Sequence, residues 1–336
     1  MRVCFFEASD ADEIYLRKRL PEDEISFFRQ PFFFSEETLC HARGCEAVSV
    51  FVHSQVTDEA MDALPHLKII ATRSTGYDHI DLAAAQRRGI LVANVPTYGE
   101  NTVAEHTFAL ILALSRNIHR AYLRTSSGDF NVQDLQGFDL KGRTIGVIGT
   151  GHIGLHVIRI AKGFDMKVIA YDARPDARAA DILDFSYADL ADLLAASDIV
   201  TLHAPLNAST RHLIGAHNIE LFKPGAILIN TARGGLVDTT ALLSALDSGF
   251  LAGAGLDVIE GEEILSEEKQ LFQNPNATEE TLRAALRFHA LLRRPDIVFT
   301  PHIGFDSVEA VERILNTTVE NLKNYRRGTP QNIIRI

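Results

Sequence analysis

Residues 145–172 read IGVIGTGHIGLHVIRIAKGFDMKVIAYD, and this stretch predicts one strand–turn–helix–strand unit. Its apolar ends, 145–148 and 167–171, have the length of buried strands, and a helical pattern lies between them. The turn reads Gly-x-Gly-x-x-Gly at 149–154, and Asp172 closes the second strand. Such glycines allow a tight turn, approach of backbone to a pyrophosphate and close helix packing, while the acid accepts hydrogen bonds from a ribose. The pattern therefore favours a dinucleotide site over a coincidental tight turn.

The length of the chain suits two domains, and its composition is ordinary for a soluble globular enzyme. The chain has 336 residues, of which 46% are hydrophobic and 23% charged. A formal net charge of −11 disfavours binding to nucleic acid or to an anionic membrane. The most apolar run, 108–114, is too short to span a bilayer and predicts a buried helix. No signal-peptide pattern precedes Leu16. We therefore expect a cytoplasmic protein without membrane or nucleic-acid partners.

The cysteines are few, odd in number and confined to the first part of the chain: Cys4, Cys40 and Cys45. They show neither a disulfide framework nor the spacing of metal ligands. We expect reduced thiols, as in a cytosolic compartment, and no metal site.

The first hundred residues alternate strand and helix patterns. Buried strands are predicted at 3–6, 47–52, 68–71 and 90–93, with a further candidate at 25–28. Helical patterns occupy 11–20, 35–42, 57–64 and 81–88, with Ser35 and Asp81 as N-caps and Gly89 as a stop. This alternation is typical of a parallel sheet covered on both faces.

The remainder predicts a second unit of the same class. One long helix is expected over 100–123, followed after the glycine turn by strands at 198–203, 226–230, 253–258 and 297–300. Helices are expected at 187–196, 218–222, 239–248 and 309–325, with an additional one near 278–294. The predicted fold is α/β, with two doubly wound parallel-sheet domains. A Rossmann-type NAD-binding domain at 101–300 is inserted into a flavodoxin-like substrate domain formed by 1–100 and 301–336.

Polar groups at predicted strand ends are the candidates for chemistry, because open α/β sheets bind ligands there. Arg233, in a glycine-bracketed turn, could bind a carboxylate through two hydrogen bonds, although most arginines are simply exposed. His302 could exchange a proton if Glu262 fixed its tautomer and favoured the charged ring. Sequence spacing leaves structural roles for both open. In the first unit, 73–78 and 94–98 are either a small pocket or ordinary turns.

Several motifs occur in a fixed order along nearly the whole chain. They are STGYDHIDLAAA at 74–85, NVPTYGENTVAEHT at 94–107, GVIGTGHIG at 146–154, LHAP at 202–205, INTARGGLVD at 229–238, GLDV at 255–258 and TPHIGF at 300–305. Together they resemble the D-specific 2-hydroxyacid dehydrogenases, with a close likeness to the D-lactate dehydrogenases. The phosphite-oxidising relatives are similar too, but they carry a lysine where Thr75 stands here, which disfavours that activity for this chain. The segment 263–294 is longer than in compact members, so the pairing of Glu262 with His302 rests on the motif.

The resemblance implies a role for each matching residue. Arg233 would bind the substrate carboxylate, His302 would be the acid/base, and Glu262 would orient His302. The implied cofactor site comprises Gly149, Gly151, His152, Ile153, Gly154, Asp172, His203, Ala204, Pro205, Thr210, Thr231, Ala232 and Asp257. The implied substrate contacts are Thr75, Gly76, Tyr98 and Arg233.

The implied activity is reversible reduction of a small 2-keto acid, pyruvate first, to the D-2-hydroxy acid with NADH. Asp172 should repel a 2′-phosphate and favour NAD, although Arg174 leaves some use of NADP open. A homodimer through 100–141 is also implied. The alternatives are a glyoxylate or hydroxypyruvate reductase, or a non-enzymatic NAD-sensing partner protein. The sequence ranks neither the keto acids nor the extent of domain closure.

Overall fold

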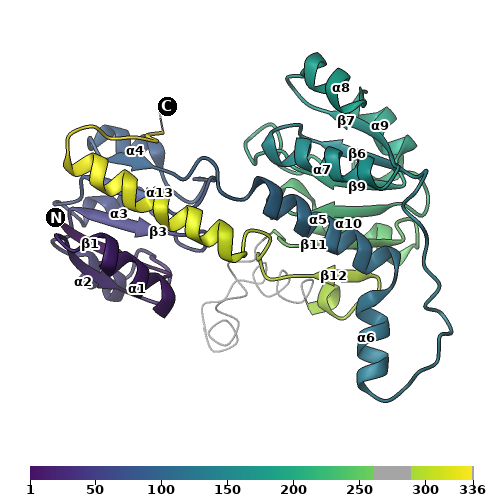
Figure 1. The fold of residues 1–336 in the computed structure, drawn as a ribbon, viewed down its shortest axis with the longest axis horizontal. Coiled ribbons are helices and arrows are strands. Elements are labelled where there is room, and N and C mark those ends of the chain that lie inside the picture. The colour runs from purple at the N-terminus through teal and green to yellow at the C-terminus, as the bar shows by residue number, and fades with distance from the viewer. Residues whose placement is uncertain (261–288, 335–336) are drawn as a thin grey trace. The chain divides into compact units, whose positions relative to one another are not determined.

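The computed structural model describes residues 1–260 and 289–334. The chain divides into two compact units, one formed by Met1–Tyr98 with Ser307–Ile336 and the other by Gly99–Asp306 (Figure 1). Each contains a sheet in which every described strand pairing is parallel. The predicted fold class, with a Rossmann domain inserted into a second α/β domain, is confirmed.

The first unit is a five-stranded sheet in the order β2-β1-β3-β4-β5. Its strands are β1 (Arg2–Phe5), β2 (Glu24–Phe27), β3 (Ala47–Val50), β4 (Ile69–Thr72) and β5 (Leu91–Ala93). Its helices are α1 (Asp10–Arg19), α2 (Glu36–Ala42), α3 (Asp58–Asp62), α4 (Leu82–Arg87) and α13 (Val308–Arg326). The helices begin where polar caps were predicted, because Ser35 and Asp81 accept backbone N–H groups through their side chains.

The alternation of side chains along β1 separates the two cores of this unit. Val3 and Phe5 pack with α1 and α13, while Cys4 and Phe6 pack with α2, α3 and α4. Both faces of the sheet are therefore covered, as a parallel sheet requires.

The prediction that the cysteines lack a disulfide is wrong. Cys4 on β1 and Cys45, just before the adjacent strand β3, are joined by a disulfide with 6.3 Å between their Cα atoms. Both side chains are buried, and Cys40 on α2 is exposed. Sequence spacing could not reveal this pair, because strand pairing brings the two cysteines together.

The second unit is a seven-stranded sheet in the order β12-β11-β10-β9-β6-β7-β8. Its described strands are β6 (Thr144–Ile148), β7 (Lys167–Tyr171), β8 (Ser186–Tyr187), β9 (Ile199–Leu202), β10 (Ile227–Asn230), β11 (Gly253–Leu256) and β12 (Ile297–Phe299). Its described helices are α5 (Glu100–Ser115), α6 (Ile118–Ser126), α7 (His152–Gly163), α8 (Ala177–Leu183), α9 (Leu190–Ala196), α10 (Thr239–Asp247) and the 3-10 turns η1 (Ile219–Leu221) and η2 (Gly234–Leu236). Strand order reverses between β6 and β9, which defines the ligand-binding switch point of such a sheet.

The expected single helix over 100–123 is two helices, α5 and α6. They meet at Asn117, whose φ of 51° is left-handed and cannot continue a right-handed helix. The carbonyl of Ser115 instead accepts the N–H of Phe138 at 2.8 Å. Three smaller differences were found. Helix α8 was not predicted. Tyr187, expected to begin a helix, lies on β8, and the helix expected at 218–222 is only the 3-10 turn η1. Most of the predicted helix at 278–294 lies outside the described residues.

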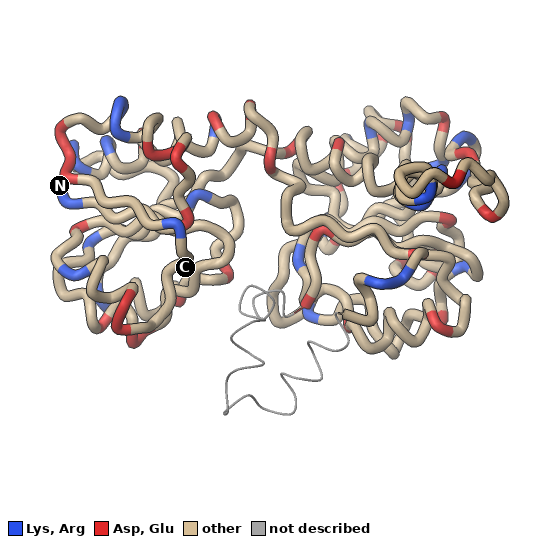
Figure 2. Tube along the Cα trace, turned by 90° about the horizontal axis from the view of Figure 1, so that it is seen from below, with Lys and Arg blue, Asp and Glu red and all other residues tan. Residues whose placement is uncertain are grey.

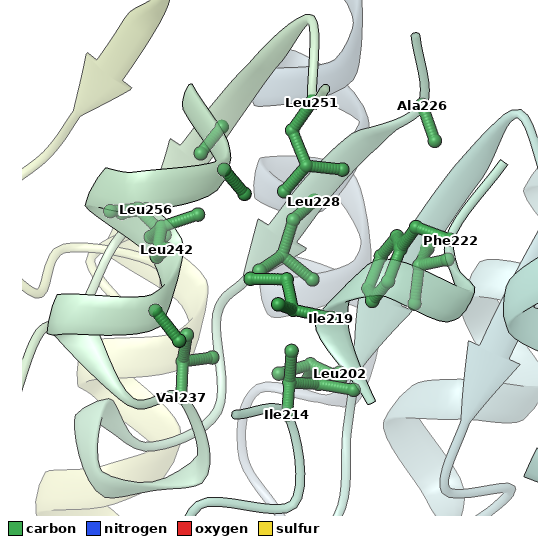
Figure 3. Close-up of a cluster of buried hydrophobic side chains, with 14 of the residues drawn as sticks. Leu202, Ile214, Ile219, Phe222, Ala226, Leu228, Val237, Leu242, Leu251 and Leu256 are labelled. Carbon is green, nitrogen blue, oxygen red and sulfur yellow. The ribbon is translucent and has the colours of Figure 1, made fainter. Parts of the chain in front are cut away.

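The larger core of the second unit lies between the sheet and α10 with η1. Leu202 and Leu228 extend from β9 and β10 toward Ile214, Ile219 and Leu242 (Figure 3). The opposite face packs against α5 and α7 through Leu110, Ile111, Val157 and Ile158.

Charged residues of both signs are interspersed over each unit along the described chain (Figure 2). None of the described helices is long and apolar enough to cross a membrane.

Candidate active site

The glycine turn after β6 follows the geometry that the sequence predicted. Gly149 has a φ of 95°, and a Cβ added to it would lie 2.7 Å from the backbone of His203. A Cβ on Gly154 would lie 2.0 Å from the carbonyl oxygen of Gly149. Both positions therefore exclude a side chain, one through its dihedral angle and contacts and the other through the close packing of α7 on the turn.

The N-terminus of α7 is open where a pyrophosphate would approach. A Cβ on Gly151, the N-cap, would meet no described atom within 4 Å. No described side chain caps this helix, and His152 in its first turn is exposed. Backbone N–H groups and the positive end of a helix are thus available to an anion. These features fit a dinucleotide at this site.

Asp172, at the end of β7, is fixed by the same turn. Its Oδ2 accepts the N–H of Thr150 at 2.7 Å and the hydroxyl of Thr150 at 3.1 Å, while Oδ1 accepts the N–H of Arg174 at 2.8 Å. Burial acts to raise the pKa of Asp172, but these donors outweigh it and the pKa lies below its ordinary value. The group is therefore an ionised acceptor beside the glycine turn.

The other side of the switch point carries the segment after β9. The N–H of His203 donates to the carbonyl of Ile148 at 2.7 Å, and Nε2 lies 2.9 Å from the hydroxyl of Thr201. Nδ1 is buried and has no protein partner among the described residues. Burial lowers the pKa of His203 to about 3, so the ring is neutral. Downstream, the hydroxyl of Thr210 donates to the carbonyl of Pro205 at 2.6 Å.

Arg233 lies in a turn that is fixed by hydrogen bonds from neighbouring side chains. The Nδ2 of Asn230 donates to the carbonyl of Arg233 at 2.9 Å, and its Oδ1 accepts the N–H of Ala232 at 3.0 Å. The hydroxyl of Thr231 lies 2.9 Å from that of Thr107 on α5. The guanidinium donates to the carbonyl of Ala232 at 2.7 Å. The turn after β10 is therefore fixed on both sides of its arginine.

Asp257 organises the neighbouring turn, which carries His302. The carbonyl of Asp257 accepts the N–H of His302 at 2.9 Å, and its carboxylate accepts the N–H groups of Ile303 and Gly304 at 2.9 and 2.8 Å. Its side chain is 2% exposed. Burial acts to raise the pKa of Asp257, but its donors, including His106 and Thr300, outweigh burial and the pKa lies below its ordinary value. Asp257 is a buried carboxylate that holds the His302 turn.

The turns after β10 and β11 are packed together, and Glu260 lies at the end of the described part of the second one. Both carboxylate oxygens of Glu260 lie 2.9 Å from Nε2 of His212, and one accepts Arg211 at 2.6 Å. The predicted orienting residue, Glu262, lies outside the described residues.

In the first unit, the predicted substrate contacts lie at the ends of β4 and β5. The hydroxyl of Thr75 donates to the carbonyl of Val95 at 2.8 Å, the hydroxyl of Ser74 donates to the carbonyl of Gly76 at 2.6 Å, and Arg313 donates to the carbonyl of Tyr98 at 2.6 Å. These bonds fix the loops that carry the three residues.

A buried arginine supports these loops. The guanidinium of Arg73, which is 3% exposed, donates to the carbonyls of Phe6 and Glu7 at 2.6 and 2.7 Å. The carboxylate of Glu7 accepts the N–H groups of Phe51 and His53 at 3.0 and 2.9 Å. The sequence indicated Arg73 only as part of a turn and carried no signal for Glu7, because the ends of β1, β3 and β4 meet only in the folded sheet.

The doubly wound sheet and its glycine turn define a protein of the dinucleotide-binding class. The model of the D-isomer specific 2-hydroxyacid dehydrogenase NAD-binding domain matches residues 108–304, and the chain belongs to that family. It is therefore an NAD-dependent oxidoreductase that acts on the CH–OH group of D-2-hydroxy acids. The predicted family, fold class, enzyme class and cofactor are confirmed.

Relatives that are named for different substrates are similar to this protein over almost the whole chain. D-lactate dehydrogenase of Escherichia coli strain K12 is 36% identical over 334 residues, covering 98% of both chains. The crystal structure of D-lactate dehydrogenase from Aquifex aeolicus with NAD and lactic acid has a TM-score of 0.87 and 36% identity, covering 97% of this chain and 96% of that one. Glyoxylate reductase of Thermococcus litoralis is 34% identical over 340 residues, with 96% of both covered.

Proposed function

We propose that this enzyme reversibly reduces pyruvate to D-lactate with NADH. The observation that carries the proposal is the joint placement of two turns in one unit. The Arg233 turn packs against the end of the Asp257–Glu260 turn at Gly234, and the His302 turn is bonded to Asp257. An arginine for a carboxylate and a histidine for a carbonyl oxygen are what a small 2-keto acid requires.

The chain's own residues would divide the chemistry as follows. Arg233 would grip the substrate carboxylate through two parallel hydrogen bonds, a geometry that orients the keto group. His302 would donate a proton to the carbonyl oxygen during reduction and take the hydroxyl proton during oxidation. The dinucleotide supplies the hydride. Glu262 as the orienting acid, and Thr75, Gly76 and Tyr98 as substrate contacts, stay predictions.

A panel of 2-keto acids tests the substrate. With NADH, we expect the highest kcat/KM for pyruvate, and a His302→Gln variant that binds NADH normally but has lost ~10²- to 10⁴-fold in kcat. A higher kcat/KM for glyoxylate or hydroxypyruvate would replace pyruvate as the substrate, and the similarity to a glyoxylate reductase makes this the second candidate. Unchanged turnover in His302→Gln would contradict the acid/base role.

We also propose a homodimer formed through α6 and the segment after it. Tyr122 and Leu123 on α6 are 69% and 67% exposed, and Phe130 and Val132 beyond it are 79% and 80% exposed. Apolar side chains grouped in this way are typical of a protein interface. Light scattering after gel filtration should give twice the chain mass for the wild type and a monomer for Tyr122→Glu/Leu123→Glu. A monomeric wild type would refute the proposal. Cytoplasmic localisation stays a prediction.

A further inference from the structure

His106 on α5 belongs to the network around Asp257, although its motif suggested no role for it. Its Nε2 lies 2.9 Å from the hydroxyl oxygen of Thr300 and 3.3 Å from Oδ1 of Asp257. The hydroxyl of Thr300 in turn donates to the same Oδ1 at 2.5 Å. Three side chains from α5, the end of β11 and the end of β12 thus meet, and one of them, Asp257, is bonded to the His302 turn.

The acceptor capacity of these groups assigns the proton on His106. An ionised carboxylate only accepts, so the single hydroxyl hydrogen of Thr300 is directed to Asp257. The hydroxyl oxygen is then an acceptor toward His106, and Nε2 must carry hydrogen. That N–H points at both Thr300 and Asp257, and it brings a donor from α5 to a buried carboxylate.

The turn that this network supports is strained. His302 has a φ of 54°, in the left-handed region that is unfavourable for a non-glycine residue. Such a conformation persists only when its surroundings fix it. Here Asp257 binds Thr300 before His302 and both Ile303 and Gly304 after it. Any loosening of Asp257 therefore reaches the backbone of His302 on both sides.

We propose that His106 is a positioning residue for His302. Its Nε2–H completes the Asp257–Thr300 network and so holds the His302 turn in its left-handed conformation. The proposal rests on the proposed function, in which His302 exchanges the substrate proton. The next residue of α5, Thr107, contacts Thr231 beside the Arg233 turn. One helix therefore holds both turns that the reaction requires, through two consecutive side chains.

Two substitutions separate hydrogen bonding from packing. His106→Gln keeps an N–H donor near the position of Nε2, whereas His106→Leu keeps volume and removes the donor. We expect His106→Leu to lose ~10- to 100-fold in kcat, with the dissociation constant for NADH and the thermal midpoint nearly unchanged. His106→Gln should retain most of the kcat. Wild-type kcat in His106→Leu, or equal losses in both variants, would overturn the positioning role.

A measurement on the enzyme without substrate keeps this test independent of the proposed reaction. Histidine ¹⁵N NMR, assigned by loss of the signal in His106→Gln, should show hydrogen on Nε2 of His106, and Thr300→Val should shift that signal. An Nε2 without hydrogen would overturn the inference whatever the turnover. Conversely, a wild type that reduces no 2-keto acid would contradict the proposed function while the NMR result still stood. If His106→Leu does not fold, Thr300→Val serves as the test variant in its place. We expect the same loss in kcat from Thr300→Val. Wild-type kcat in that variant would overturn the proposal.

Discussion

The carbonyl carbon of Ile259 lies 2.1 Å from the position that a Cβ atom would take on Gly234. The turn after β10 and the turn after β11 therefore touch through backbone, which cannot shift as a flexible side chain can. We predict that Gly234→Ala lowers the free energy of unfolding by ~1–3 kcal/mol and displaces Arg233, so that kcat/KM for the keto acid falls more than NADH binding does. Urea unfolding and steady-state kinetics check this.

Gly235→Ala is the matched control, because the three atoms nearest to a Cβ there belong to the flexible side chains of Leu206, from 3.1 Å, and Arg211, at 3.8 Å. It should be closer to wild type in both measurements. Equal effects of the two alanines would contradict the role given to the backbone contact.

Replacing Arg233 tests the two-bond grip on the carboxylate. Lysine keeps the charge but offers a single point donor, so Arg233→Lys should lose ~1.5–3 kcal/mol of transition-state binding, a fall of ~10- to 150-fold in kcat/KM. The dissociation constant for NADH should stay within a small factor, since the turn is held by Asn230 and Thr231 rather than by the guanidinium. Wild-type kcat/KM in the lysine variant would exclude bidentate binding.

Asp172 should set the preference for NADH. In Asp172→Asn the negative charge that would repel a 2′-phosphate is gone, so the ratio of kcat/KM for NADH to that for NADPH should fall by ~10-fold or more. Asp184→Asn is a suitable control, because Asp184 is an exposed partner of Lys162. A wild type that already prefers NADPH, or an unchanged ratio in Asp172→Asn, would remove Asp172 from this role.

His203 should make the protein less stable in acid. Its folded pKa of about 3 lies below the ordinary 6.5, so the unfolded chain binds a proton that the folded chain does not. The contribution to stability is complete above pH 6.5 and is lost as pH falls toward 3. At pH 4.5, two units below the unfolded pKa and still above the folded one, the loss amounts to about 2.7 kcal/mol.

A neutral side chain in place of His203 removes that dependence. Urea unfolding of His203→Gln should lose less stability between pH 7 and pH 4.5 than the wild type, while the exposed His66→Gln should behave like the wild type. An identical pH dependence in wild type and His203→Gln would contradict the lowered pKa, because it would mean that His203 takes up its proton equally well in the folded and unfolded states.

Much of the fold could be predicted because its information is local. Apolar runs of strand length, polar caps such as Ser35 and Asp81, and the glycines at 149–154 each act over a few residues. The strand ends that carry Arg233 and His302 could be predicted as well. Their strands are local patterns, and a parallel sheet places the carboxyl ends of its strands at one edge.

What the sequence did not reveal depends on contacts between distant segments. The bond between Cys4 and Cys45 follows from the pairing of β1 with β3, and the contact of His106 with Asp257 from the packing of α5 near β11 and β12. The break at Asn117 was missed because 100–123 is apolar enough for one helix, whereas Phe138 takes the carbonyl of Ser115. The pairing of Glu260 with His212 likewise appears only in the fold, because the two residues are 48 positions apart in the chain.

The interruption of the first unit by the second has a consequence for synthesis on the ribosome. The core beneath α1 contains Val3 and Phe5 from the beginning of the chain, and Leu315, Val319 and Leu322 of α13 from its end. That core cannot close until the last segment has left the exit tunnel, whereas all of Gly99–Asp306 emerges earlier. The NAD-binding unit is therefore complete first, and the sheet face that carries Val3 and Phe5 is only partly covered, by α1, until α13 arrives.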